Sequence, residues 1–384
     1  MNQPLAIVGA STRSAAASAL RAGFQPLAAD LFADADLRRI ATATRIAPYP
    51  DGFIDWMRTI EPPAWMYTGA LENHPELVDQ LGWIAPLWGN SGEVLARVRS
   101  PWELSEVLAA AGLLFPEIRH SAGNIPRDGS WLTKTYAGAS GSGVREWGEE
   151  RGARSEDERG TLACYQRKID GVPCAAVFVA VNGETKLLGV TRQLIGEPWL
   201  GAHGFQYAGS IGPWAISDVT RSTIEQIGSA IADRFELIGL FGVDFILDGD
   251  NVWTLEVNPR YTASVEIVER FSGISAIAAH VKACDGQLPK PHQSYPKSIF
   301  PMCGKAILFA KRELIISDEF AGWSLMESAR LPWPTVADVS PAGTAIETDR
   351  PILSIFAEAA TPAEVKQQLR DRVAEIERRL YAIQ

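Results

Sequence analysis

The sequence predicts a mixed α/β and α+β protein with an N-terminal parallel-sheet domain, a larger central domain and a small β-rich C-terminal domain that ends in a helix. Three observations support this prediction. Residues 5–30 read as strand, turn, helix and strand, the order that makes neighbouring parallel strands. Short β-rich runs follow residue 130, with one long helical segment at 218–235 among them. A capped helical segment then spans residues 361–381.

The first domain is expected at residues 1–97. An apolar run at 5–8 ends in a Gly-Ala-Ser turn, and a helical pattern at 13–22 follows and stops at a glycine. Residues 26–30 then read as a second strand, which ends in an aspartate. Residues 64–88 carry a Pro-Pro pair, aromatic side chains and a glycine turn, and we expect them to add a strand to the same layer.

The second domain is expected at residues 98–295 and the third at residues 296–384. Prolines at 289, 291 and 296 mark the boundary between them. In the second domain we expect a helix at 101–111 and strands at 131–134, 175–181, 186–190, 243–247 and 252–257. In the third domain, strands are expected at 305–309 and 352–356, and Thr361 and Pro362 cap and open the last helix.

Composition excludes several classes of protein. Apolar residues make up 46% and charged residues 21% of the chain, an ordinary globular balance. The net charge of −10 argues against a nucleic-acid partner or a membrane bound through bulk charge. No apolar stretch is long enough to cross a bilayer, and we see no signal peptide. The four cysteines form no Cys-x-x-Cys pair, which favours a reducing compartment, so we expect a cytoplasmic protein.

The first candidate site is a lysine that precedes a glycine-rich loop. The expected strand at 131–134 ends in Lys134 and leads into a Gly, Ser and Ala loop at 137–143. Glycine lets backbone N–H groups approach anionic oxygens closely, and lysine supplies a point charge. The lysine comes before the glycines, so this is not a Walker loop, and a flexible hairpin turn would look similar.

The second and more specific candidate is a hairpin with acidic side chains. Two apolar strands flank a turn at 248–251, and the period of two puts Glu256 and Asn258 on one face. Asp244 on the neighbouring strand can share that face, and Arg260 continues it. Two carboxylates and an amide oxygen are hard ligands that suit Mg²⁺. Because three such groups on an apolar hairpin are costly without a cation, we favour a metal site over a solvated polar face.

Together these motifs resemble the ATP-grasp superfamily. The pattern is a lysine before a glycine-rich loop, then Gly-Val-Asp and Leu-Glu-Val-Asn-Pro-Arg further along the chain. The sequence looks most like the predicted ATP-dependent carboxylate–amine ligases related to biotin carboxylase. The resemblance covers most of the chain. It implies an ATP-grasp fold with a pre-grasp domain at 1–97, a nucleotide clamp at 98–295 and a small C-terminal domain.

The resemblance implies a reaction as well as a fold. Such ligases phosphorylate a carboxylate with ATP, release ADP, and join the resulting acyl phosphate to an amine. Some similar enzymes build one-carbon-carrier cofactors of the methanofuran or methanopterin type, for example by joining glutamate to tyramine. The expected partners are therefore a small-molecule carboxylate and an amine, with ATP and Mg²⁺ or Mn²⁺ as cofactors. Family members are often dimers, which keeps a homodimer open.

The resemblance also implies a role for the motif residues. Lys134 and Arg260 would be catalytic, Lys134 on phosphate oxygens and Arg260 on the transferring phosphoryl group. The metal would lie between the two carboxylates of the hairpin, Asp244 and Glu256, and Asn258. The loop would close over the triphosphate and exclude water. Its expected contact residues are Gly138, Ser140, Gly141, Ser142 and Gly143.

The adenine is expected at the strand and turn around residues 165–171. The resemblance places Gln166 where many relatives have an acidic residue that receives the adenine amino group, and the Gln amide oxygen can accept that hydrogen bond. Backbone groups of Arg167 and Ile169 would contact the adenine edge, and Asp170 is a candidate for the ribose. Relatives often have a second lysine near the start of the clamp. In this chain Arg97, Arg99 or neither takes that place.

Four residues are candidates for substrate binding. Arg192 ends a probable strand and could bind a carboxylate with both arms, or form a surface ion pair. His203 lies in a loop rich in glycine and aromatic residues, where it could act as a base or be structural. Ser11 and Arg13 follow the first strand, where an anion could bind, although Ser11 could also simply cap the helix. The absence of Gly-x-Gly-x-x-Gly argues against a dinucleotide.

Two other functions stay open at this point. One is a biotin-carboxylase-like enzyme that activates bicarbonate, which the similarity of the C-terminal segment favours. The other is a non-catalytic protein that senses nucleotide with a degenerate clamp. The intact set of metal-type ligands and Arg260 argues against a sensor, because a sensor needs no arginine for phosphoryl transfer.

Overall fold

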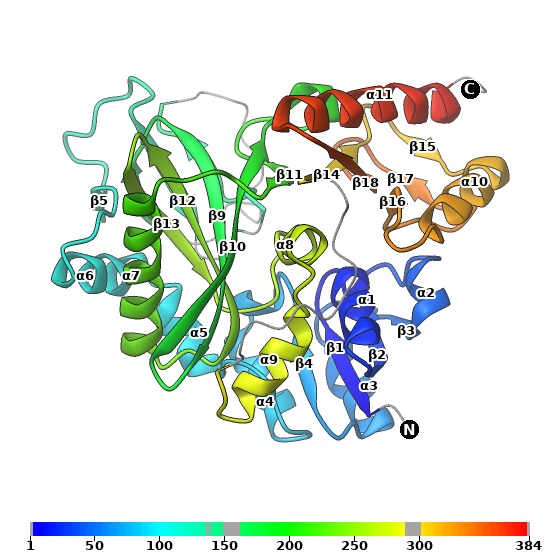
Figure 1. The fold of residues 1–384 in the computed structure, drawn as a ribbon, viewed down its shortest axis with the longest axis horizontal. Helices are drawn as coiled ribbons and strands as arrows, with labels where there is room; N and C mark the ends of the chain where they lie inside the picture. The colour runs from blue at the N-terminus through cyan, green and yellow to red at the C-terminus, as the bar shows by residue number, and fades with distance from the viewer. Residues whose placement is uncertain (1–2, 136–137, 139, 149–161, 289–300, 382–384) are drawn as a thin grey trace.

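A computed structural model of the chain describes residues 3–135, 138, 140–148, 162–288 and 301–381. These residues form a four-stranded parallel sheet, a four-stranded antiparallel sheet and an eight-stranded antiparallel sheet, with helices between and around them (Figure 1). The predicted fold class is confirmed. No helix among the described residues is long and apolar enough to cross a membrane.

The N-terminal parallel sheet has the strand order β3-β2-β1-β4. Its central strand β1 is buried from Leu5 to Val8 because apolar residues follow one another without alternation, as in a strand covered on both faces. Strand order reverses beside β1, so the carboxyl ends of β1 and β4 border the kind of crevice in which open α/β sheets bind ligands. The elements are β1 (Pro4–Val8), α1 (Arg13–Arg21), β2 (Gln25–Asp30), α2 (Leu37–Ile40), β3 (Thr42–Arg45), α3 (Gly52–Ile60), β4 (Trp65–Tyr67), η1 (Leu71–Asn73), α4 (Pro75–Gly82) and α5 (Gly92–Val98).

The small antiparallel sheet follows α6 (Pro101–Ala110) and has the order β5-β8-β6-β7. Its two faces differ in chemistry because the strands alternate. One face buries Trp131 and Tyr165 with Ile125 in a small apolar cluster, and the other carries Lys134 and Gln166. The strands are β5 (Ile118–Arg119), β6 (Trp131–Thr135), β7 (Val144–Glu146) and β8 (Leu162–Arg167).

The large sheet has the order β13-β12-β9-β10-β11-β14-β18-β16. It therefore includes strands that the sequence assigned to a separate C-terminal domain. The join lies between β11 and β14, where Gly209 pairs with Ala306, and a Cβ on Gly209 would lie only 2.0 Å from the carbonyl oxygen of Lys305. The strands are β9 (Val172–Val181), β10 (Glu184–Ile195), β11 (Tyr207–Gly212), β12 (Gly239–Asp248), β13 (Asn251–Asn258), β14 (Met302–Phe309), β16 (Val336–Ala337) and β18 (Pro351–Ala359). The expected domain boundary at 295 and 296 falls outside the described residues.

The helices cover both faces of the large sheet. Helix α7 lies at the predicted residues, and its side chains Ile224, Ile231 and Phe235 pack on Phe178 and Phe241 of the sheet. Helix α11 begins at the predicted cap, where Thr361 and Glu364 each accept a hydrogen bond from the other's backbone N–H. The remaining elements are η3 (Pro198–Leu200), α7 (Asp218–Phe235), α8 (Val265–Ser272), α9 (Ala276–Cys284), β15 (Leu314–Ile315), α10 (Asp318–Ser328), β17 (Ala345–Ile346) and α11 (Pro362–Tyr381).

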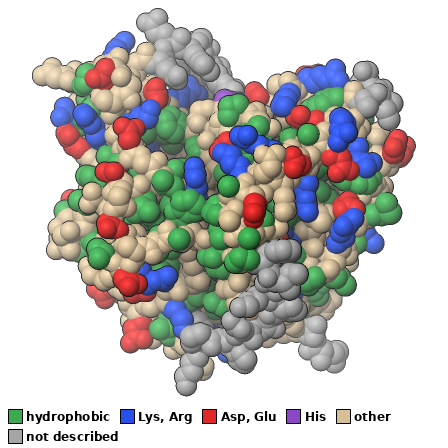
Figure 2. Space-filling model, turned by 45° about the horizontal axis from the view of Figure 1, so that its top comes forward, with side chains coloured by type: hydrophobic (Ala, Val, Ile, Leu, Met, Phe, Trp, Pro, Cys, Tyr) green, Lys and Arg blue, Asp and Glu red, His purple; other side chains and the backbone are tan. Residues whose placement is uncertain are grey.

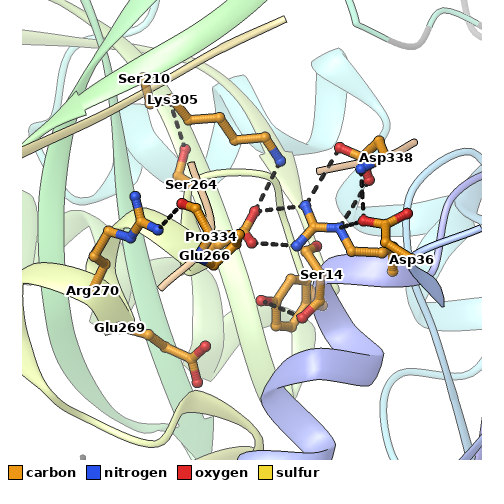
Figure 3. Close-up of polar contacts among 12 residues, drawn as sticks. Ser14, Asp36, Ser210, Ser264, Glu266, Glu269, Arg270, Lys305, Pro334 and Asp338 are labelled. Carbon is orange, nitrogen blue, oxygen red and sulfur yellow. Dashed lines mark hydrogen bonds and ion pairs between the residues drawn. The ribbon is translucent and has the colours of Figure 1, made fainter. Parts of the chain in front are cut away.

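Helix α8 lies in the middle of the molecule, between the large sheet, the N-terminal domain and the C-terminal strands (Figure 1). Its Glu266 is buried and accepts hydrogen bonds from Arg13 of α1 and, at 3.0 Å, from Lys305 Nζ of β14 (Figure 3). Arg13 also contacts Asp338 Oδ1 at 2.9 Å. Burial disfavours the charge of Glu266, but Arg13 and Lys305 outweigh it and hold the pKa of this carboxyl far below its usual range. Arg13 and Lys305, which lie far apart in the sequence, are thus both held by Glu266 of α8.

His280 of α9 joins the large sheet to the N-terminal domain. Its Nδ1 accepts a hydrogen bond of 2.9 Å from the Leu240 N–H, and its Nε2 lies 3.1 Å from the Trp88 carbonyl oxygen. The ring is therefore neutral, with the proton on Nε2 donated to Trp88. Burial lowers the pKa of His280 to about 4, although the contact with Trp88 opposes that shift.

This arrangement predicts a loss of stability in mild acid. Between pH 6.5 and 4 the unfolded chain takes up a proton on His280 that the folded chain does not, so stability falls as the pH falls through that window. We expect His280 to contribute a fall of about 2 kcal/mol in the free energy of unfolding between pH 7.5 and pH 5. Denaturant unfolding of the wild type and of His280→Gln at both pH values measures it. Equal pH dependence in the two proteins would contradict the prediction.

Candidate active site

The hairpin of β12 and β13 brings the predicted metal ligands together. Asp244 and Glu256 are directly opposite each other in the register, and Asn258 follows on the same face. The Asn258 amide donates to Asp244 Oδ2 at 3.1 Å, and the Gln193 amide donates to Asp244 Oδ1 at 3.0 Å. Lys134 of the small sheet reaches across, with Nζ 3.6 Å from Glu256 Oε2. The two sheets therefore meet at this acidic pair.

The charges of the acidic pair are coupled. Burial, and then the charge of Glu256, raise the pKa of Asp244 to about 8. The Glu256 side chain is 50% exposed, so desolvation opposes its charge only weakly, and Lys134 and then Arg99 lower the pKa of that carboxyl. Among the described residues no group of three or more His, Cys, Asp or Glu side chains is placed to hold a metal ion. The set here has two carboxylates and an amide oxygen, which fits a cation that keeps further ligands from water and phosphate, as Mg²⁺ does.

Arg260 follows the hairpin and lies against the N-terminal domain. Its Nε and one terminal nitrogen donate to Glu72 Oε1 at 2.8 and 2.5 Å. The same terminal nitrogen donates to Asn258 Oδ1 at 3.2 Å, and the other donates to the Tyr261 carbonyl oxygen at 3.2 Å. The guanidinium is therefore held on several sides, with 14% of the side chain exposed.

Arg99, and not Arg97, lies at the site. The Arg99 guanidinium contacts Glu72 Oε1 at 3.5 Å, Asn73 Oδ1 at 2.8 Å and the Gly138 carbonyl oxygen at 3.3 Å. Arg97 points elsewhere, over the ring of Phe235 and toward Glu103. Of the two arginines that the sequence offered for a second cation, Arg99 is the one that lies beside Glu72 and Gly138, and its contact with nucleotide stays a prediction.

The inner face of the small sheet offers an unpaired polar group. Gln166 is 2% exposed, and its amide nitrogen has no hydrogen-bond partner among the described residues. It pairs across the ladder with Leu132, two residues from Lys134 and on the same face. A buried amide without a partner is costly, and a purine ring nitrogen arriving at this face would satisfy it. The sequence prediction used the amide oxygen of Gln166, whereas the structure leaves the amide nitrogen unpaired.

The glycine-rich loop packs on the segment before β11. Gly141 has a φ of +81°, and a Cβ there would lie 1.9 Å from the Phe205 carbonyl oxygen, so only glycine fits. Ser140 supports the contact, because its carbonyl oxygen accepts a hydrogen bond of 3.1 Å from the Tyr207 N–H. Ser142 is exposed, and Gly143 accepts at 3.0 Å from the Thr135 N–H. Residues 137 and 139 of the predicted loop lie outside the described residues.

The turn after β8 is only partly free for the contacts expected of it. The backbone N–H of Arg167 donates to the Glu117 carbonyl oxygen at 2.8 Å, so that group is not available to an adenine edge. The Arg167 side chain is exposed and stacks on Trp131 from outside. Ile169 is half-buried and Asp170 is exposed, which leaves their predicted contacts with nucleotide as predictions.

Arg192 lies on the other face of the large sheet from Asp244. Its cross-strand partner Cys174 belongs to the apolar cluster under α7, and its guanidinium lies over the Trp214 ring at 5.4 Å. Because side chains alternate along β10, the next residue, Gln193, reaches Asp244 instead. Arg192 therefore lies away from the predicted metal ligands, and its binding of a substrate carboxylate stays a prediction.

Arg13 also has a different role from the predicted one. It is 3% exposed, and its guanidinium is taken up by Glu266 and Asp338, so the anions that it binds belong to the protein. Ser11 is exposed at the end of β1, and its carbonyl oxygen accepts a hydrogen bond of 2.8 Å from the Thr68 hydroxyl. Asp30 accepts hydrogen bonds from the backbone and hydroxyl of Thr12, a structural role for the aspartate at the end of β2.

His203 is exposed in the loop between η3 and β11. This loop contacts the glycine-rich loop, through Phe205 and Tyr207, so His203 remains a candidate near the substrates. The molecular surface is indented between the part that carries the small sheet and the part that carries α11, and Lys and Arg side chains gather near the hollow (Figure 2).

The sequence did not reveal Glu72 and Gln193 as members of the site. Both contact a motif residue, Glu72 through Arg260 and Gln193 through Asp244. A signal for Glu72 existed, because it follows closely the last strand of a parallel sheet, where functional side chains often lie. Gln193 could have been found only from the register of β10, which the sequence does not define.

Comparison with known proteins agrees with this geometry. Residues 98–264 match a family model described as an ATP-grasp domain. Formate-dependent phosphoribosylglycinamide formyltransferase of Pyrococcus horikoshii is 36% identical over 87 residues, which are 22% of this chain and 20% of that protein. The chain therefore matches about a fifth of the length of this curated relative.

Solved structures share the fold over nearly the whole chain. The biotin carboxylase domain of Hydrogenobacter thermophilus 2-oxoglutarate carboxylase, crystallised as a dimer with MgADP, ADP and bicarbonate, has a TM-score of 0.69 at 15% identity and covers 97% of this chain and 89% of its own. L-amino acid ligase from Bacillus licheniformis also has a TM-score of 0.69 at 15% identity, over 97% of both chains. Residues 98–264 thus match an ATP-grasp domain, and the fold of the whole chain is similar to that of these solved structures.

Proposed function

We propose that the protein is an ATP-dependent carboxylate–amine ligase. The observation that carries the proposal is the set of contacts between the two sheets. Lys134, the acidic pair and Arg260 lie on one connected path, with Lys134 at 3.6 Å from Glu256 and Asn258 between Asp244 and Arg260. Cations and metal-type ligands so arranged are the groups that phosphoryl transfer requires.

The residues that would hold ATP come from the small sheet and its loop. Lys134 would hold phosphate oxygens, Gln166 would hold the adenine, and the backbone of Gly138 and of Ser140 to Gly143 would lie along the phosphates. Asp244, Glu256 and Asn258 would hold Mg²⁺ or Mn²⁺. The metal, when bound, neutralises phosphate charge and orients the phosphate groups.

The substrate carboxylate would attack the terminal phosphoryl group of ATP, with formation of the new C–O–P bond and release of ADP. Arg260 would stabilise the negative charge that spreads over the phosphoryl oxygens. The amine would then attack the acyl carbon, phosphate would leave, and the amine proton would pass to solvent or to a base. His203 is the candidate base in the nearby loop. Most of the rate acceleration would come from positioning and charge stabilisation.

The acid and the amine define the finer proposal. We propose ligases that build one-carbon-carrier cofactors as the class to test first, with glutamate and tyramine as the first pair. A second copy of the chain as partner stays part of the proposal, and light scattering after size exclusion measures it.

The first experiment is mass spectrometry of the protein with ATP, Mg²⁺ and a pooled metabolite extract, with glutamate and tyramine as a defined sample. We expect ADP and a new mass equal to acid plus amine minus water. Glu256→Gln, which loses one metal-ligand charge, should lower product formation by at least about 100-fold without unfolding. ADP formation that depends on bicarbonate alone would favour a carboxylase, AMP with pyrophosphate would contradict the acyl-phosphate route, and nucleotide binding without any turnover would favour a sensor.

Nucleotide affinity gives a second prediction. Lys134→Met and Arg99→Met should each weaken MgADP binding by about 10- to 100-fold, because each loses a charged hydrogen bond near the phosphates. Arg97→Met is the matched control, since Arg97 lies two residues away in sequence and points to Phe235. Calorimetry measures all three affinities. Equal affinity in Arg99→Met and Arg97→Met would remove Arg99 from the site.

Arg260 gives a third prediction. Because its proposed partner is the phosphoryl group in transfer, Arg260→Ala should lower turnover by at least about 100-fold and change ATP affinity by less than about threefold. Initial rates of ADP release at varied ATP, with the ATP dissociation constant measured separately, test this. Equal losses in turnover and in affinity would mean that Arg260 only binds nucleotide.

A further inference from the structure

Glu72 is a buried carboxylate at the meeting point of the N-terminal domain and the ATP-grasp domain. It lies in η1, directly after β4, and its side chain is 1% exposed. The turn before η1 lies against Arg260, because a Cβ added to Gly69 would be 3.5 Å from the Arg260 guanidinium carbon. The N-terminal domain therefore touches Arg260 with both a backbone segment and a charge.

One oxygen of Glu72 serves two arginines. Glu72 Oε1 lies 2.5 Å from a terminal nitrogen of Arg260 and 3.5 Å from one of Arg99. The other oxygen, Oε2, is buried and has no hydrogen-bond partner among the described residues. Such a carboxylate is costly to bury, and the two arginines are what stabilise it.

The two arginines lead to different parts of the site. Arg260 is bonded to Asn258, and Asn258 to Asp244, on the metal side. Arg99 is bonded to the carbonyl oxygen of Gly138, at the start of the glycine-rich loop. Glu72 therefore connects the loop over the phosphates with the arginine that faces the metal ligands.

A competing arrangement shows why this connection matters. Only Asn258 separates Arg260 from the acidic pair, because it accepts from Arg260 at 3.2 Å and donates to Asp244 at 3.1 Å. Without Glu72, the guanidinium would be drawn onto the acidic pair, where it would replace the cation as their partner. The Glu72 carboxylate holds the Arg260 guanidinium away from the acidic pair, which leaves Asp244 and Glu256 available to a metal.

We propose that Glu72 is a positioning residue that sets the direction of Arg260 toward the transferring phosphoryl group and couples it, through Arg99, to the glycine-rich loop. This inference rests on the proposed phosphoryl transfer and adds a residue from outside the ATP-grasp domain to it. Glu72 itself does not touch the phosphoryl group.

The test uses aluminium fluoride, which mimics a phosphoryl group in transfer, and therefore needs no knowledge of the acid or the amine. Calorimetry of the full chain gives the affinity for MgADP with and without aluminium fluoride. The wild type should bind MgADP more tightly with the mimic. In Glu72→Gln, the gain in MgADP affinity that the mimic gives should be at least about tenfold smaller than in the wild type. The affinity for MgADP without the mimic should change by less than about threefold. Glu72→Asp, which keeps the charge, should retain more of the gain than Glu72→Gln.

Two further variants separate positioning from general packing. Glu266→Gln removes another buried carboxylate, which pairs with Arg13 of the N-terminal domain, and it should leave the gain unchanged. Glu72→Gln combined with Arg260→Ala should lose no more of the gain than Arg260→Ala alone, because Glu72 acts through Arg260. Thermal melting of each variant shows that it is folded, and Glu72→Asp serves if Glu72→Gln is not.

Each contrary result has a distinct meaning. If Arg260→Ala loses the gain and Glu72→Gln keeps it, the role of Glu72 is overturned and the proposed function stands. Equal losses in Glu72→Gln and Glu266→Gln would also overturn it, since general packing would then explain both. A wild type that binds no MgADP, or that gains nothing from the mimic, would overturn the proposed function and the role of Glu72 together.

Discussion

The pairing of buried Glu266 with Arg13 and Lys305 holds the parts of this molecule in their places. A carboxylate in an apolar interior is stable only when cations and hydrogen bonds replace the water that it lost. The cations come from α1 near the start of the chain and from β14 near its end, so the carboxylate fixes both on α8. Removing one partner would leave an uncompensated charge, which typically costs several kcal/mol. Helix α8 begins at Val265, shortly after Arg260 along the chain.

The same constraint on buried charge shapes the site. Each ionic group there is satisfied by a neighbour from a different element: Gln193 from β10 and Asn258 from β13 on Asp244, Lys134 from β6 near Glu256, and Glu72 from η1 on Arg260. A nucleotide and a metal would enter a network that is already ordered, which lowers the cost of arranging the site during reaction. Among the described residues of the site, the acidic pair, the amide nitrogen of Gln166 and the second oxygen of Glu72 are left with charge or hydrogen bonding unbalanced.

Much of the fold could be predicted from the sequence because its signals are local. Apolar runs, turn residues and caps predicted β1, α7, the hairpin of β12 and β13, and α11 at or near their observed bounds. The acidic face of the hairpin was predictable because alternation along one strand fixes Glu256 and Asn258 together. Features that depend on distant pairing were not predictable. Gln193 reaches Asp244 while Arg192 lies on the opposite face, Arg13 finds its partners on α8 and after β16, and the C-terminal strands join the large sheet.

The seam between β11 and β14 has a consequence for recombination among relatives. A graft that replaced the segment after residue 301 with that of a protein of similar fold would have to supply a strand that pairs with β11, because the two strands are joined by a hydrogen-bond ladder. The Lys305 backbone can approach Gly209 closely only because glycine has no side chain. A donor strand with a different register would not form the same hydrogen bonds with β11. If the donor strand failed to pair, β11 would present unpaired backbone groups to solvent and invite aggregation. The C-terminal segment can therefore be exchanged only together with β11, so a graft should transfer β11 and β14 as one unit.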